Sequence, residues 1–336
     1  MIIEDIIIME FNLPWVEKYR PSKLSQIVGQ EKIINSLISI FEGGSFPHLL
    51  FYGGSGSGKT STILAILNDY FGIKKKLMVM RLDASDDRGI NSVREEIKGF
   101  AEKKNYFTKG IKVIILDEAD SMTFDAQFAL RRIIEKYSSS TRFCLICNYD
   151  NKIIPAIKSR CAEFKFNPIL ENILVTHLEF VSKSENIKYD KKTLKIINDI
   201  AKGDLRKAIN LLQSASVITK DGSKKLDKNL CYNVVGFPKP DEIDIVTSLL
   251  LDETKTIEYC SKNINKLILE NGYSISIVLK EIVDLIVKKI CDNKIDARKY
   301  AYIFSELSNL ENKVSKSTFG DIYLSMLISI FKRKID

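Results

Sequence analysis

The pattern of apolar and polar positions changes near the middle of this 336-residue chain. In the first half, short apolar runs rich in β-formers alternate with amphipathic stretches, for example residues 60–72 and 124–137. This alternation is typical of βαβ units arranged around a parallel sheet. The predicted strands are 48–53, 77–84, 111–120 and 141–148.

From residue 167 onward the strand patterns fade and helical periodicity takes over. In "GDLRKAINLLQSAS", Asp204 is placed to cap a helix that has Leu205, Ala208, Ile209 and Leu212 on one face. A glycine and two prolines in "VVGFPKPDE" (234–242) predict a linker, and the residues after it read as helices only.

The charge and the cysteines restrict the function only weakly. A formal net charge of +8 permits an anionic partner such as nucleic acid without establishing one. No apolar run approaches the roughly 18 residues of a membrane span.

Cys144 and Cys147 form a C-x-x-C pattern, but both fall in a predicted strand, where positions three apart point to opposite faces. With no second pair nearby, they are interpreted as packed thiols in a reducing cell rather than as a zinc or redox site.

The segment "GGSGSGKT" fits the phosphate-binding pattern G-x-x-x-x-G-K-[ST]. It follows a predicted strand and opens a predicted helix, so its backbone amides and the positive end of the helix dipole can face phosphates. Lys59 can reach the terminal phosphates, and the Thr60 hydroxyl suits Mg²⁺. The predicted nucleotide-binding residues of this loop are Gly53, Gly54, Ser55, Gly56, Ser57, Gly58, Lys59, Thr60 and Ser61.

Two carboxylates follow a buried strand in "VIILDEAD". At the carboxyl end of that strand, Asp117 can hold Mg²⁺ through water, and Glu118 can orient or deprotonate an attacking water. Asn148 ends the next strand and is either a ligand of water or γ-phosphate or an ordinary turn residue. Arg206, in the first turn of its helix, opposes the helix dipole unless a phosphate lies nearby, and a solvated arginine is the alternative.

Six blocks together resemble the small subunits of replication factor C, which are AAA+ ATPases that load a sliding clamp onto primed DNA. These blocks are "LPWVEKYRP", the phosphate loop, "ASDDRGI", "LDEADSMT", "NYDNKIIPAIKSRC" and "GDLRKAIN". The likeness is close from residue 13 to about 215, weak over 216–336, and most specific to one branch of these subunits. It implies an α/β fold: a RecA-like parallel-sheet core (1–167), a helical lid (168–235) and an all-α collar that serves oligomerisation (236–336).

The resemblance implies a role in trans for Arg160, in "IPAIKSRCAEFKF". This arginine stands after the last segment that reads as a buried strand, with no acidic residue following it until Glu163. In the family, the arginine of Ser-Arg-Cys is a finger that reaches the γ-phosphate held by the adjacent subunit. That role accounts for an arginine without an evident partner in its own core.

Further site residues are implied by the resemblance alone. The positions around the adenine are Val16, Tyr19, Arg20, Val28 and Gly29, while Asn148 and Arg206 match the two sensors. Arg88, Arg94 and Lys152 match positions that track template phosphates, a kind of contact that carries no sequence preference. The aromatics Phe100, Tyr106 and Phe107 match a clamp-facing region, with core packing as the alternative.

Two positions depart from the family pattern. Gly54 and Ser55 stand where relatives have two prolines, which predicts a more flexible loop, and Asp83 replaces a usual asparagine.

The expected cofactors are ATP and Mg²⁺. The expected partners are the other subunits of a hetero-pentamer, the clamp PCNA and primer–template DNA, in the nucleus and without a membrane. A non-hydrolysing scaffold that donates Arg160 and a junction-migrating AAA+ helicase are the competing hypotheses. Lys59, Asp117 and Glu118 argue against the scaffold, while "WVEKYRP" and Ser-Arg-Cys argue against the helicase.

Overall fold

The computed structural model describes residues 13–44, 46–84, 90–103, 110–219, 226–292, 297–316 and 320–333. The chain forms two compact units, Met1–Asp227 and Lys228–Asp336. The predicted three-domain boundaries stay a prediction.

The first unit is built on a five-stranded parallel sheet with strand order β2-β3-β4-β1-β5. The strands are β1 (His48–Gly53), β2 (Val79–Asp83), β3 (Lys112–Asp117), β4 (Thr141–Cys147) and β5 (Cys161–Phe166). β1 and β4 lie in the middle and are almost fully buried, as their unbroken apolar runs predict. The predicted parallel sheet and its first four strands are therefore confirmed.

The fifth strand was not predicted. Arg160 does follow the last largely buried strand, β4, but an edge strand comes directly after it. β5 begins at the residue after Arg160 and, among the described strands, pairs with β1 alone, at the edge of the sheet. Its residues alternate, with Glu163 and Lys165 exposed and Phe166 buried, so it lacks the continuous apolar run of a central strand.

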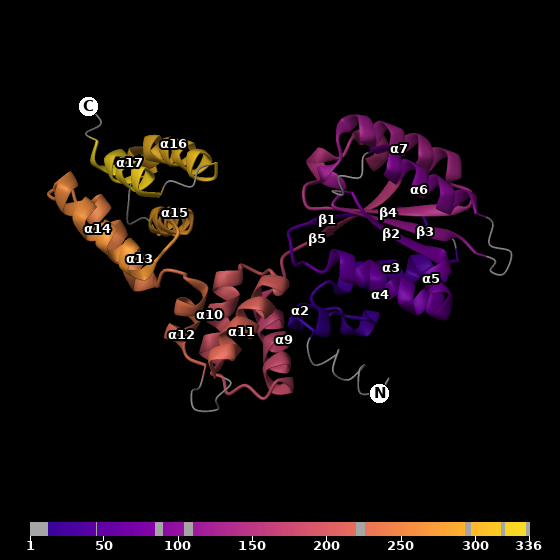
Figure 1. The fold of residues 1–336 in the computed structure, drawn as a ribbon, viewed down its shortest axis with the longest axis horizontal. Coiled ribbons are helices and arrows are strands. Elements are labelled where there is room, and N and C mark those ends of the chain that lie inside the picture. The colour runs from indigo at the N-terminus through magenta and orange to yellow at the C-terminus, as the bar shows by residue number, and fades with distance from the viewer. Residues whose placement is uncertain are drawn as a thin grey trace. The chain divides into compact units, whose positions relative to one another are not determined.

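Helices cover both faces of the sheet (Figure 1). One face is covered by α3 and α4 and the other by α6 and α7, with separate apolar clusters between helices and sheet. Cys144 belongs to the first cluster and Cys147 to the second, which confirms that they point to opposite faces. The helices of this region are α2 (Trp15–Lys18), η1 (Leu24–Gln26), α3 (Glu31–Glu42), α4 (Lys59–Phe71), η2 (Gly72–Lys74), α5 (Lys75–Met78), α6 (Ile90–Glu102), η3 (Ala119–Ser121), α7 (Phe124–Tyr137), η4 (Asp150–Lys152) and α8 (Pro155–Lys158).

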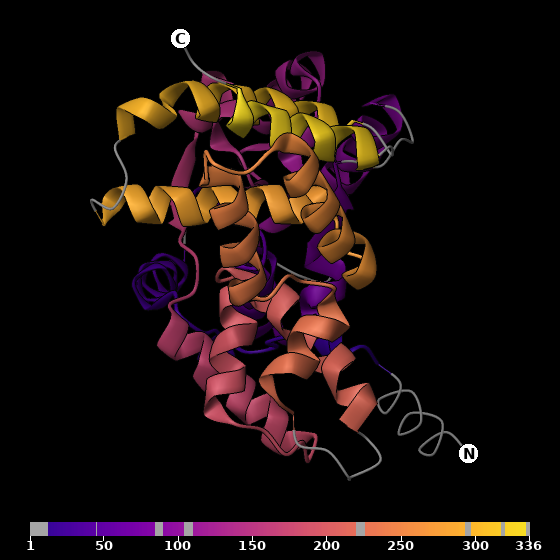
Figure 2. The same ribbon diagram turned by 90° about the vertical axis from the view of Figure 1, so that its left-hand side faces the viewer.

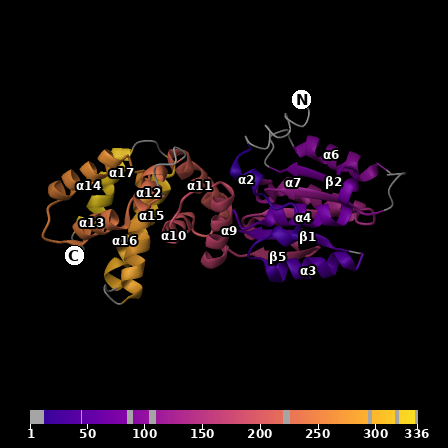
Figure 3. The same cartoon turned by 90° about the horizontal axis from the view of Figure 1, so that it is seen from below.

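Three helices complete the first unit: α9 (Glu171–Ser184), α10 (Lys191–Ala201) and α11 (Leu205–Thr219). They pack on one another, and α2, far away in sequence, lies beside them (Figure 3). The Trp15 backbone N–H donates to Gln213 Oε1 at 3.0 Å, which joins α2 to α11. The N-terminal "PWVEKYRP" block thus lies between the sheet region and the helical region.

The second unit is entirely helical over its described residues (Figure 2). It comprises α12 (Lys228–Val235), α13 (Pro240–Leu251), α14 (Ile257–Asn271), α15 (Ile275–Cys291), α16 (Ala297–Val314) and α17 (Gly320–Lys332). Its core includes Ile264, Ile282, Leu307 and Leu327, all almost fully buried. Within the described residues, no helix has the length and apolar character needed to cross a membrane.

Candidate functional site

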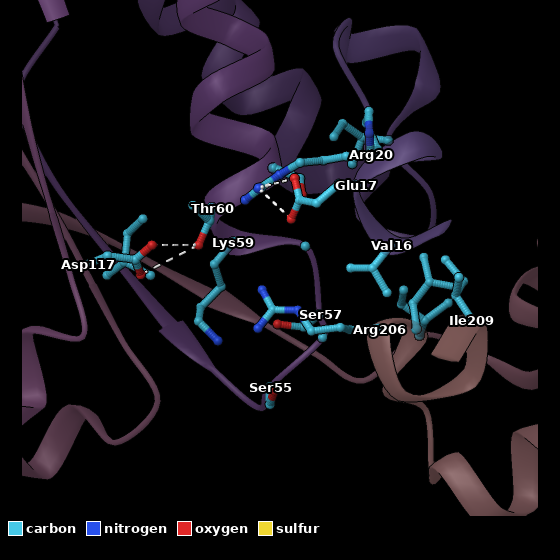
Figure 4. A pocket seen from close by; sticks show the side chains of 18 of the residues that line it. Val16, Glu17, Arg20, Ser55, Ser57, Lys59, Thr60, Asp117, Arg206 and Ile209 are labelled. Atoms are coloured by element: carbon cyan, nitrogen blue, oxygen red, sulfur yellow. Dashed lines mark hydrogen bonds and ion pairs between the residues drawn. The ribbon is translucent and has the colours of Figure 1, made fainter. Parts of the chain in front are cut away.

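A pocket of about 240 Å³ opens at the carboxyl ends of β3 and β4, above the loop between β1 and α4. Of the predicted residues, the following line it: Val16, Tyr19, Arg20, Val28, Ser55, Gly56, Ser57, Gly58, Lys59, Thr60, Ser61, Asp117, Glu118, Asn148 and Arg206. Gly29, Gly53 and Gly54 are not among the lining residues, although Gly29 follows Val28 and Gly54 precedes Ser55, which are. Helices α2 and α11 close the side opposite the sheet (Figure 4).

The phosphate loop needs its glycines for two different reasons. Gly58 ends the loop in the left-handed region (φ 96°) and precedes the first residue of α4. A Cβ on Gly56 (φ 65°) would lie 1.8 Å from Asp204 Oδ1. Asp204 itself accepts the Lys207 backbone N–H at 3.0 Å, so the predicted cap of α11 also lies against the phosphate loop.

Lys59 is held inward by the loop. Its side chain is buried, and Nζ donates to the carbonyl oxygens of Gly53 (2.7 Å) and Gly54 (2.8 Å) and to Asn148 Oδ1 (3.0 Å). Burial lowers the pKa of Lys59 from its ordinary value. Phosphate oxygens beside this ammonium would stabilise its charge and so counteract the lowering of its pKa by burial.

The predicted Mg²⁺ residues face each other. Thr60 Oγ1 lies 3.2 Å from Asp117 Oδ2 (Figure 4). One hydroxyl and one carboxylate at a phosphate site fit Mg²⁺, which keeps several waters and takes few protein ligands. This pair lines the pocket at the phosphate loop and is therefore the candidate magnesium position.

The backbone of Glu118 is in the left-handed region (φ 53°, ψ 38°), which is uncommon for a residue other than glycine. Strain of this kind costs of order 1–3 kcal/mol and collects at functional sites. The Glu118 side chain is exposed at the pocket, where it can contact a water.

Two residues that sequence reasoning missed position the pocket. Gln30 is buried, and its Nε2 donates to the carbonyl oxygens of Ser57 (3.2 Å) and Asn167 (2.8 Å). Asp120 Oδ2 accepts the backbone N–H groups of Asn148 and Tyr149, both at 3.2 Å. Their only sequence signal was proximity to motifs, Gln30 after "IVG" and Asp120 in "DEAD".

The predicted adenine side is tied to the helical region by Tyr19. Its hydroxyl donates to Glu185 Oε1 at 2.6 Å, and Lys18 contacts the same oxygen at 2.6 Å. Burial and this hydrogen bond raise the pKa of Tyr19, so the phenol stays protonated. Arg20 pairs with Glu17 at 2.9 Å within the same block.

Arg206 extends from α11 toward the phosphate loop, with its guanidinium on the same side of the pocket as Lys59 (Figure 4). The geometry therefore favours the phosphate-directed interpretation over a purely solvated arginine. Its role in binding stays a prediction.

Arg160 does have an acidic partner in its own subunit, which corrects the expectation made from the sequence. Its Nη2 lies 2.5 Å from Glu135 Oε1 on α7, and Nη1 donates to the Ala156 carbonyl oxygen at 2.7 Å. Arg131 Nε shares the Glu135 oxygen at 3.0 Å. Arg160 remains about one-third exposed and lies outside the pocket lining.

The predicted DNA-contacting residues are only partly described. Lys152 is exposed in η4, with Nζ 5.2 Å from the centre of the Tyr149 ring. Arg94 falls in α6, and Arg88 lies outside the described residues. Of the predicted clamp-facing aromatics, Phe100 packs against the apolar cluster under α7, as the core alternative has it, while Tyr106 and Phe107 lie outside the described residues.

Three family profiles match successive parts of the chain. The profile described as "ATPase family associated with various cellular activities (AAA)" matches residues 49–169. "RCF1/5-like, AAA+ ATPase lid domain" matches 176–217, and "Replication factor C C-terminal domain" matches 238–329. The predicted AAA+ fold with a lid and an all-α C-terminal region is thereby confirmed.

Solved structures share this fold at low identity. The Thermotoga maritima RuvB Holliday junction branch migration motor aligns with a TM-score of 0.55 at 14% identity, over 80% of this chain and 91% of that one. The Aeropyrum pernix Orc1 protein, solved in complex with DNA, aligns with a TM-score of 0.54 at 19% identity, over 95% of this chain and 86% of that one. At such identities the likeness concerns the fold alone.

Curated relatives match nearly the whole chain. "Probable replication factor C subunit 5" of Dictyostelium discoideum is 39% identical over 327 residues, covering 97% of this chain and 92% of that protein. "Replication factor C subunit 3" of Saccharomyces cerevisiae is 37% identical over 328 residues, covering 97% and 94%. "Replication factor C subunit 5" of Homo sapiens is 39% identical over 322 residues, covering 96% and 92%. The chain therefore belongs to the replication factor C subunits, within the AAA+ ATPases.

Proposed function

We propose that this chain is an ATP-hydrolysing subunit of a hetero-pentameric clamp loader, which opens the sliding clamp PCNA and places it on primer–template DNA in the nucleus. The observation that carries the proposal is the convergence of Lys59, Thr60, Asp117 and Arg206 on one pocket. Family membership supplies the assembly, because relatives along the whole chain are named as subunits.

The residues of the pocket suit phosphoryl transfer to water. Lys59 and Arg206 would bind phosphate oxygens, and Thr60 with Asp117 would hold Mg²⁺. When bound, Mg²⁺ supplies charge neutralisation at the phosphates. Glu118 would accept a proton from the attacking water, since its exposed carboxylate lies at the pocket beside Asp117.

Arg160 would act on the neighbour's nucleotide. It lies outside the lining of its own pocket and is partly exposed, as a group that serves another subunit must be. To do so it must leave or share Glu135, which is exposed and pairs with Arg131 as well. An exposed ion pair of this kind is weak, so its exchange for a phosphate is favourable.

The proposed DNA contacts are Arg88, Arg94 and Lys152. Contacts to phosphates by such side chains make affinity depend on salt rather than on sequence, which suits a loader that acts at any primer end.

The test is steady-state ATP hydrolysis by this chain alone, and then with its four presumed partner subunits, the clamp and primed DNA. We expect slow turnover alone, strong stimulation on assembly, and a loss of about 10³–10⁵-fold at the neighbour's site with Arg160→Ala. Fast turnover by the chain alone, or an unaffected Arg160→Ala assembly, would contradict the mechanism.

The competing functions give different results in the same assay. If Glu118→Gln in this chain left the turnover of the assembly unchanged, the chain would be a scaffold that only donates Arg160. Processive unwinding of DNA by the purified chain would instead indicate a helicase.

A further inference from the structure

An arginine that none of the motifs includes contacts Asp117 in the lining of the nucleotide pocket. Arg81 lies on β2 and lines the pocket, and its Nη2 is 2.9 Å from Asp117 Oδ2. The sheet register explains the contact: Asp83 is aligned with Asp117, and Arg81, two residues earlier, points to the same face. That face is the one covered by α4, on which Thr60 lies.

We propose that Arg81 is a built-in counter-ion for Asp117. Mg²⁺ must displace Arg81 from this carboxylate, and Arg81 partly replaces Mg²⁺ when a nucleotide binds without metal. The inference rests on the proposed nucleotide site, and it concerns how strongly nucleotide affinity depends on magnesium.

Displacement follows from the sharing of one carboxylate oxygen. Asp117 Oδ2 accepts a hydrogen bond from Arg81 at 2.9 Å, and the same oxygen lies 3.2 Å from Thr60 Oγ1. Asp117 and Thr60 are the two side chains that would hold the metal. A guanidinium and a hydrated Mg²⁺ cannot both sit on that oxygen without strong repulsion. Arginine stays charged at every relevant pH, so the competition cannot be relieved by deprotonation.

The displacement has a small cost, because the Arg81 side chain is 47% exposed and Asp117 is 14% exposed. Ion pairs with one exposed partner contribute about 1 kcal/mol or less, which corresponds to a factor of about five in an equilibrium. Arg81 therefore weakens Mg²⁺-dependent binding without preventing it.

The second half of the proposal concerns the metal-free site. Arg81 contacts the Asp117 oxygen that lies 3.2 Å from Thr60 Oγ1, so its charge stands beside the position proposed for the metal and the phosphates it would bind. Without Mg²⁺, an arginine there can stabilise the phosphates by charge-assisted hydrogen bonds. Removing Arg81 should therefore have opposite effects on affinity with and without metal.

The experiment measures the affinity of N-methylanthraniloyl-ATP for the full chain by fluorescence, in excess Mg²⁺ and again in EDTA. For Arg81→Gln we expect binding about three- to fivefold tighter with Mg²⁺ and about three- to fivefold weaker in EDTA. The ratio of the affinity with Mg²⁺ to the affinity in EDTA should then rise by a factor of about 10 to 25. Arg81→Lys keeps the charge and should leave the ratio close to that of the unmodified chain.

Arg20→Gln is the matched control, since Arg20 also lines the pocket but pairs with Glu17 instead of Asp117. It should change both affinities in the same direction. If Arg81→Gln left both affinities unchanged, or weakened both equally, the proposal would be overturned.

Failure of this inference can be distinguished from failure of the proposed function. If the unmodified chain bound no nucleotide under either condition, both would be wrong. If it bound nucleotide, and Lys59→Ala abolished that binding, an unchanged ratio in Arg81→Gln would reject the role of Arg81 alone.

Discussion

The pocket and the surface around Arg160 use the same kinds of charged side chains in contrasting ways. In the pocket, Lys59 is 8% exposed and bonded to three oxygens of its own loop and strand ends. Arg160 is 35% exposed and pairs with Glu135, which a second arginine also contacts. The pocket cation is buried among oxygens of its own subunit, whereas Arg160 contacts Ala156 and Glu135 but stays partly exposed to solvent.

The difference fits the role proposed for each group. A group that binds its own subunit's nucleotide gains from being oriented beforehand, because less ordering is needed on binding. A group that must reach a neighbour has to be accessible and easily released. The contrast in exposure is therefore the one expected between a group proposed to act in cis and a group proposed to act in trans.

The largest difference between variants of Lys59 and of Arg160 should appear in the affinity for ATP. Lys59→Ala removes a buried ammonium at the phosphate position and should weaken ATP binding about 100-fold or more. Arg160→Ala in the isolated chain should leave the affinity within about twofold, because it touches no part of the pocket. Calorimetric titration of both variants with Mg·ATP tests this.

Similar losses for the two variants would contradict the assignment of Arg160 to a neighbouring site. A circular dichroism spectrum and a melting curve of each variant exclude misfolding as the cause.

A glycine pair tests how tightly the pocket is packed. Gly56→Ala would force a Cβ to 1.8 Å from Asp204 Oδ1 at a φ of 65°, so either the loop or the cap of α11 must move. We expect a loss of about 2–3 kcal/mol in the free energy of unfolding, measured with urea, together with weaker nucleotide binding.

Gly54→Ala is the control in the same loop. A Cβ there meets nothing within 4 Å, and no positive φ has to be kept. Its stability should stay close to that of the unmodified chain. Equal losses in the two variants would show that Gly56 is not specially constrained.

Local motifs explain why so much of the pocket could be predicted. Lys59, Thr60 and Asp117 lie at fixed offsets from strand ends and from a helix start, so neighbouring residues determine their positions. Gln30, Arg81 and Asp120 were missed because their partners are brought together only by the folded sheet.

The surface around Arg160 shows what local patterns cannot reveal. β5 alternates between exposed and half-buried residues at the sheet edge, so it lacks the apolar run that identified the central strands. Glu135 lies on α7 and meets Arg160 through the packing of α7 on α8, which no spacing in the sequence encodes.

A pH titration tests the packing of the sheet at the start of β1, away from the pocket. His48 begins β1, and its Nδ1 accepts the Phe143 backbone N–H at 3.1 Å. Burial, and to a lesser extent Arg142, lower the pKa of His48 to about 4. The unfolded chain protonates at higher pH, so stability is full above about pH 6.5 and is lost as the pH falls toward 4.

Between about pH 7.5 and about pH 5, this histidine should cost the fold about 2 kcal/mol, measured by urea unfolding. His48→Asn retains an acceptor for the Phe143 N–H and does not titrate. The free energy of unfolding of this variant should therefore fall by about 2 kcal/mol less than that of the unmodified chain over the same pH range. If the free energy of unfolding changed with pH in the same way for the unmodified chain and for His48→Asn, His48 would not be the source of the pH dependence.

The smallest effect is expected for Glu135→Gln, which removes the negative charge that pairs with Arg160 while keeping the side-chain size. Glu135 is exposed and shared between two arginines, so the melting temperature and the affinity for Mg·ATP should not change measurably. In the assembled complex, ATP turnover should stay within about twofold, because a phosphate would replace Glu135 as the partner of Arg160. A loss approaching that of Arg160→Ala would mean instead that Glu135 orients Arg160 toward the neighbour, and the exposed surface would then be as preorganised as the pocket.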